Sequence, residues 1–129
     1  MNLRDRFRRP PAPERLDTSA VERRLRERFA FLEHDKGFEL ARSERLPDGA
    51  RVAYKNVAAG RAVMVFARAA RGVWAGIGHL DHAGRLRPVS REAIETGEWR
   101  PLGTVDIRSV ETLDDAIETL ALALGGTHG

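Results

Sequence analysis

The chain has 129 residues, of which 42% are hydrophobic and 32% are charged, and this balance excludes an intrinsically disordered chain. Its 22 basic and 19 acidic residues leave a formal net charge of only +3, and no cysteine is present for thiolate chemistry or a disulfide, which is typical of a cytoplasmic protein. No run of about 18 apolar residues occurs, so we expect no membrane-spanning segment.

The first residues predict a basic, proline-rich arm over residues 1–16, ahead of a single domain over residues 17–129. The four arginines of the arm are Arg4, Arg6, Arg8 and Arg9. With Asp5 as the only acid among residues 1–9, they account for the whole net charge of +3, and residues 10–129 are neutral. The arm has two interpretations, a binding element for an anionic partner such as nucleic acid, and a solubilising tail.

A capping-box pattern at Ser19 and Glu22 marks the expected start of an N-terminal helix. The apolar stripe that follows predicts a helix over residues 20–33, and Gly37 is expected to close it in the left-handed conformation. The histidine, aspartate and lysine at residues 34–36 fall at this helix end, where basic groups complement the helix dipole. We therefore interpret them as a helix terminus rather than as a catalytic pair.

Four segments with strand character follow in two hairpins. The first hairpin turns at residues 47–49, Pro-Asp-Gly, and the second turns at Arg71-Gly72. Short links between consecutive strands favour an antiparallel meander over a parallel sheet, which needs longer crossover connections.

Residues 82–108 give a weaker pattern. Ser90 is placed to cap a short helix that ends at Gly97, and the segment around Pro101 predicts an edge strand, where proline is tolerated. A second capping box at residues 112–115 begins the C-terminal helix. The predicted fold class is α+β, with an N-terminal helix, an antiparallel meander of four to five strands and a C-terminal helix, both helices packing on one sheet face.

Side-chain alternation predicts that both faces of this sheet are apolar. Met64, Phe66 and Trp74 fall on the face opposite to the one expected to carry the helices. A sheet covered on one side only normally alternates apolar with polar residues, so the second face needs a cover. Residues 82–108 are long enough to supply it, and a homodimer or another protein is the alternative. We name Met64, Phe66 and Trp74 as candidate partner-binding residues.

No pattern of established catalytic, cofactor or metal chemistry is found in the sequence. The nearest metal constellation is His79, Asp81 and His82, but strand alternation places the two histidines on opposite faces and no further ligand is suitably spaced. The run GIGHLDHAG lacks the third glycine of a dinucleotide-binding loop. We therefore expect no catalytic, cofactor or metal site.

The runs RERFAFLEHDKGFEL, VAYKNV and VWAGIGHLD together resemble a pattern of small, uncharacterised bacterial α+β proteins, written F-x-F-L, then G-F, then V-x-Y-x-N. Some proteins of this size and build act as immunity-like or accessory partners of toxins. The resemblance covers roughly residues 25–81 and consists of core and turn positions, so it implies a shared fold and carries no active-site residue across.

The sequence therefore predicts a non-enzymatic binding or interaction protein, immunity-like in its relation to another protein. A nucleic-acid-associated protein that acts through the arginine arm is one alternative. A small enzyme with an unrecognised site is the other.

Overall fold

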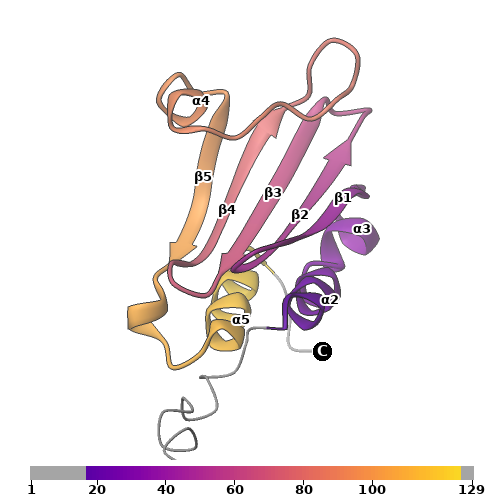
Figure 1. The fold of residues 1–129 in the computed structure, drawn as a ribbon. Helices are drawn as coiled ribbons and strands as arrows, with labels where there is room; N and C mark the ends of the chain where they lie inside the picture. The colour runs from indigo at the N-terminus through magenta and orange to yellow at the C-terminus, as the bar shows by residue number, and fades with distance from the viewer. Residues whose placement is uncertain (1–16, 126–129) are drawn as a thin grey trace, which may run out of the picture.

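The computed structural model describes residues 17–125, and it confirms the predicted α+β class (Figure 1). In chain order the elements are α2 (Thr18–Arg28), α3 (Phe31–Asp35), β1 (Glu39–Leu46), β2 (Gly49–Asn56), β3 (Arg61–Arg68), β4 (Gly72–His79), α4 (Arg91–Glu95), β5 (Trp99–Val105), the 3-10 helix η1 (Ile107–Ser109) and α5 (Leu113–Ala123). The four arginines of the predicted arm, Arg4, Arg6, Arg8 and Arg9, lie outside the described residues.

The first helix begins earlier than predicted, with a different cap. The Asp17 carboxylate accepts hydrogen bonds from the amides of Ser19 and Ala20 at 3.1 and 3.2 Å. The predicted capping box is wrong, because Glu22 instead accepts a hydrogen bond from the Ser43 hydroxyl at 2.7 Å. An ionised carboxylate suits the positive end of a helix, which explains why the aspartate takes the cap position.

The predicted single helix over residues 20–33 is divided into α2 and α3. Phe29 is the C-cap of α2, with φ −99° and ψ 11°, and α3 starts two residues later. Gly37 has φ +76°, as predicted for a left-handed helix end, and the Phe38 amide donates to the Leu32 carbonyl at 3.0 Å. This closure turns the chain from α3 into β1.

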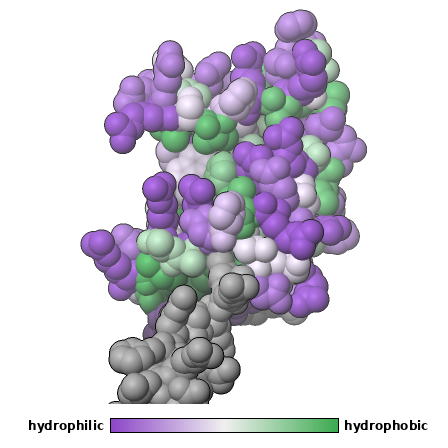
Figure 2. Space-filling view, in the orientation of Figure 1, coloured by the Kyte–Doolittle hydropathy of each residue, from purple (hydrophilic) through white to green (hydrophobic). Residues whose placement is uncertain are grey.

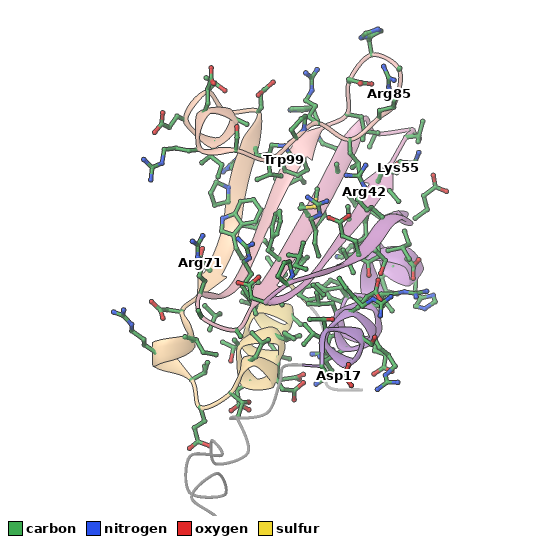
Figure 3. The ribbon with its side chains drawn as sticks, viewed as in Figure 1. Asp17, Arg42, Lys55, Arg71, Arg85 and Trp99 are labelled. Carbon is green, nitrogen blue, oxygen red and sulfur yellow. The ribbon has the colours of Figure 1, made fainter. Side chains whose placement is uncertain are left out.

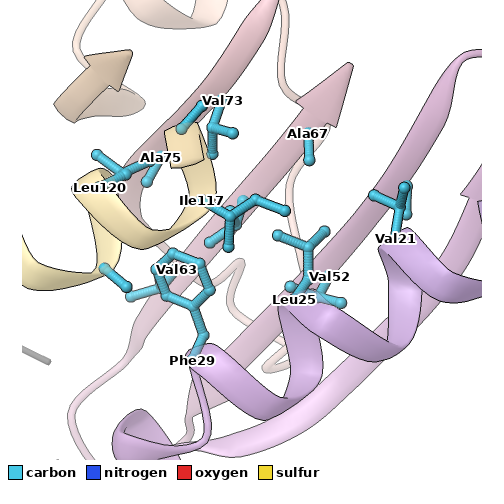
Figure 4. Packing of buried hydrophobic residues seen from close by; sticks show 14 of the residues in the cluster. Val21, Leu25, Phe29, Val52, Val63, Ala67, Val73, Ala75, Ile117 and Leu120 are labelled. Atoms are coloured by element: carbon cyan, nitrogen blue, oxygen red, sulfur yellow. The ribbon is translucent and has the colours of Figure 1, made fainter. Parts of the chain in front are cut away.

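The five strands form an antiparallel meander in the order β1-β2-β3-β4-β5. Both long helices, α2 and α5, pack on one face of this sheet, as predicted (Figure 1). Val52, Val65 and Ala75 lie opposite one another on β2, β3 and β4 and are fully or almost fully buried beneath the helices. Figure 4 shows the helix side chains that meet this layer, which include Leu25, Phe29, Ile117 and Leu120.

Ion pairs join the two helices side by side. Arg24 Nε lies 2.6 Å from Asp114 Oδ1, and Arg28 Nε lies 2.6 Å from Glu118 Oε2. Arg24 and Arg28 are four residues apart on α2, and their partners Asp114 and Glu118 are four residues apart on α5 in the same order. The two helices therefore run in the same direction across the sheet. The hydrogen bond to Asp114 raises the pKa of Arg24 above its ordinary value.

Tyr54, the only tyrosine of the chain, is 1% exposed in this core and leads to a prediction for alkaline pH. Burial raises the pKa of its phenol above the ordinary value, and the charge of Glu33 raises it further against the opposing effect of Arg26. The folded pKa therefore exceeds the unfolded value of about 10. The stability linked to the neutral phenol is complete below about pH 10 and is lost as the pH rises through the folded pKa.

We expect the ultraviolet absorbance of the phenolate to appear together with unfolding in an alkaline titration, rather than before it. Tyr54→Phe removes this linkage and should move the alkaline unfolding midpoint to higher pH, as followed by circular dichroism. A phenolate signal that titrates near pH 10 while the fold stays intact would contradict the buried position of Tyr54.

Candidate functional site

The second face of the sheet is partly covered by residues 80–98, which we call the strap. The strap connects the end of β4 to the start of β5 and crosses the sheet at the top of Figure 1. The strap and the sheet together form a second apolar cluster of Ala53, Ala62, Met64, Leu80, Ala93 and Trp99, and the residues packed against it are Phe66, Trp74, Leu86, Val89 and Ile94. For this part of the face, the cover comes from residues 82–108 of the chain itself, which was one of the alternatives that the sequence left open.

Hydrogen bonds shape the strap and join it to β5. The Asp81 carboxylate accepts from the amides of Ala83 and Arg85 at 2.8 and 2.9 Å, and the bond from Arg85 is the main reason that the pKa of Asp81 is lowered. At the other end, the indole N–H of Trp99 donates to the Pro88 carbonyl at 3.1 Å. The bonds to Asp81 thus close a turn within the strap, and the indole bond joins Pro88 of the strap to β5.

The histidines of the GHLDH run lie at a strand end and a turn. His79 is the last residue of β4 and His82 follows in the turn, and both are exposed. Asp81 between them is engaged with backbone amides. Within residues 17–125, no group of three or more metal-ligating side chains lies together.

Below the strap, the second face forms an open groove of about 440 Å³. Its lining comes from β3, β4, the turn between them, the strap and β5, namely Phe66, Arg68, Arg71, Gly72, Val73, Trp74, Val89, Ser90, Arg91, Ile94 and Thr104. Figure 2 shows apolar side chains below α4 with hydrophilic side chains on both sides of them. The groove is therefore apolar at its base and polar at its edges.

The three candidate partner-binding residues occupy different places on this face. Met64 is 2% exposed and lies in the cluster beneath the strap. Phe66 and Trp74 are half-buried and line the groove, with ring centroids 5.8 Å apart and planes inclined by 57°. A partner in the groove would therefore reach Phe66 and Trp74 directly and Met64 only through them.

Arginines surround the groove, and sequence reasoning did not identify them. Arg68 pairs with Asp48 at 3.2 Å, whereas Arg71 and Arg91 are exposed and form no ion pair within the described part of the chain. Arg71 lies in the β3–β4 turn and Arg91 is the first residue of α4. Only the path of the strap brings these two segments to one groove. No local pattern in the sequence could therefore have indicated that the two arginines line the same site.

A further cationic group lies beside the groove on β1 and β2. Arg51 is paired with Glu44, and its guanidinium carbon lies 5.6 Å from the centre of the Phe66 ring. Burial lowers the pKa of Arg51, and the charge of Arg42 lowers it further. Figure 3 shows Arg42 on the β1 side of the sheet and Arg71, which lines the groove, on the β5 side.

Comparison of the chain with protein-family models, with curated proteins and with solved structures gives no match. Among the described residues, no helix is both long and apolar enough to cross a membrane.

Proposed function

We propose that the protein is a non-enzymatic binding protein that holds another protein against the groove over Phe66 and Trp74. The observation that carries this proposal is a half-buried aromatic pair at the base of an apolar groove, beside Arg71 and Arg91, which are exposed and have no ion-pair partner among residues 17–125. Tryptophan and arginine are the side chains most often found at the energetic centres of protein interfaces.

The polar groups of the groove support binding rather than proton transfer. They are the guanidinium groups of its arginines and the hydroxyls of Ser90 and Thr104. Guanidinium groups stay protonated in proteins, so they donate hydrogen bonds but do not exchange protons near neutral pH. The Ser90 hydroxyl also accepts a hydrogen bond from the Ala93 amide at 3.0 Å as the cap of α4.

An immunity-like relation to a partner protein, which the sequence resemblance implies, is one form of such binding. The alternative of a nucleic-acid-associated protein depends on the arginine arm, which lies outside the described residues. The alternative of a small enzyme has no residue constellation in the groove to support it.

The test is photo-crosslinking in the organism that encodes the protein. A benzoyl-phenylalanine at Thr104 places the reactive group in the groove, and the same residue at Thr119, exposed on α5, is the matched control. We expect a discrete protein adduct from position 104 that position 119 does not give. No adduct from position 104, or the same adducts from both positions, would overturn the proposal.

A further inference from the structure

We infer that the groove binds an acidic protein segment, with an apolar side chain seated against Trp74 and carboxylates on both sides of that anchor. This inference rests on the proposed function and adds to it the chemistry of the partner.

The first carboxylate position is set by the arginines of the groove. Arg71 and Arg91 line it from the β3–β4 turn and from α4, and neither has an ion-pair partner within residues 17–125. A guanidinium group donates two parallel hydrogen bonds to a carboxylate, which gives geometric selectivity as well as charge attraction. The acidic residues of α4, Glu92 and Glu95, are not part of the lining, so the groove presents positive charge.

The second carboxylate position lies across the aromatic pair. Glu44, Arg51, Phe66, Trp74 and Thr104 are aligned by strand register across β1 to β5. Arg42 pairs in register with Ala53, two residues along β2 from Arg51 and on the same face, and its charge adds to burial in lowering the pKa of Arg51, which is paired with Glu44. A carboxylate bound at this point would offset the repulsion between the two guanidinium groups.

The strand spacing sets the spacing of the acids in the partner. Arg42 on β1 and Trp74 on β4 are separated by three strand intervals, about 14 Å, and by two residues along the strands, about 7 Å, so they lie about 16 Å apart. An extended segment advances about 3.3 Å per residue and covers this distance in about five residues. We therefore expect one acidic residue about five positions from the apolar anchor and another close to the anchor on its opposite side.

A second copy of the chain fits this surface poorly. A two-fold symmetric dimer brings the same patch of each subunit together, so Arg42, Arg71 and Arg91 would face a set of like charges. The surface carries arginines on both sides of the aromatic pair. This arrangement is complementary to a partner that has acids on both sides of an apolar residue.

The aromatic pair also suits an inserted side chain better than stacked bases. Base stacking needs open, flat ring faces, but Arg51 lies over the Phe66 ring and the two rings are inclined by 57°. A Cβ atom at Gly76 would lie 2.4 Å from Trp74 Cη2, so the indole lies directly over this glycine and against the sheet.

The test uses the full chain and a display library of short random peptides, with the selected peptides then synthesised and titrated. The Arg71→Glu, Arg91→Glu double variant reverses the charge of the groove, and Arg61→Glu, Arg108→Glu reverses two exposed arginines outside it. Thr104→Trp, on an exposed edge-strand position, fills the groove without changing its charge. Each variant is first checked for an unchanged thermal melt, and oligonucleotide binding and molecular mass in solution are measured on the same samples.

We expect selected peptides with acids on both sides of an aromatic or aliphatic residue. Their binding should weaken about tenfold or more in the Arg71, Arg91 variant and in Thr104→Trp, and less than about twofold in the Arg61, Arg108 control. If the selected peptides carry no acids but lose their binding in Thr104→Trp, the groove is still the binding site and this inference is overturned. Peptides insensitive to every groove variant, or no enriched peptide, would count against the inference and the proposed function together. If an oligonucleotide binds in a groove-dependent way, the occupant is a nucleic acid and not an acidic protein. If the chain is a dimer that the Arg71, Arg91 variant dissociates, the occupant is a second copy of the chain.

Discussion

Trp99→Ala should lower the free energy of unfolding by about 3–5 kcal/mol, which is a large part of the about 5–15 kcal/mol that stabilises a typical domain. Trp99 is fully buried, and its indole lies so close to Gly78 that a Cβ atom there would come within 2.9 Å of it. The substitution removes the largest side chain beneath the strap and the hydrogen bond to the Pro88 carbonyl. Urea denaturation followed by circular dichroism measures the change.

Trp99→Phe is the matched control, because it keeps an aromatic ring and removes only the hydrogen bond and part of the contact area. We expect it to cost about 1–2 kcal/mol. Since the chain has two tryptophans, this variant also leaves Trp74 as the only indole, so its fluorescence reports on the groove. A loss below about 1 kcal/mol for Trp99→Ala would mean that the strap is not held to the sheet by this side chain.

The parts of the fold that could be predicted from the sequence are those set by neighbouring residues. The Thr112 hydroxyl accepts from the Asp115 amide at 3.1 Å, Ser90 caps a short helix that is followed by Gly97 with φ +84°, and Pro101 lies in edge strand β5. Each of these depends on local backbone chemistry, which the sequence states directly. The N-terminal cap was missed because Ser19 and Asp17 are both good caps, and the contact of Glu22 with Ser43 on β1 is not local.

The candidate site divides in the same way. Strand alternation was sufficient to place Phe66 and Trp74 together on the second face. The burial of Met64 and the position of Arg91 depend on where the strap crosses the sheet, and Arg71 belongs to the site only because its turn contributes to the lining of the groove. These relations join segments with no shared sequence pattern, so only the three-dimensional structure could supply them.

Gly72→Ala should also be strongly destabilising, by about 2–5 kcal/mol, because two independent costs add at this position. Gly72 has φ +95°, a conformation that disfavours any residue with a Cβ atom. The added Cβ would also lie 1.9 Å from the Val105 carbonyl oxygen, so the end of β5 would have to move away from β4. Because Gly72 lines the groove, we expect groove-dependent binding to weaken as well, and denaturant unfolding and peptide titration measure the two effects.

Gly60→Ala separates the two costs. Gly60 has φ +67° in the turn between β2 and β3, but an added Cβ there would meet no atom within 4 Å. Only the conformational cost remains, so this variant should lose about 1–2 kcal/mol and keep its binding unchanged. The difference between the two variants then measures the contact of Gly72 with the β5 backbone. Equal losses of unfolding free energy in both variants would show that β5 moves away from β4 at this point without an energetic penalty. The edge of the groove would then be less rigid than the close approach of Gly72 to Val105 implies.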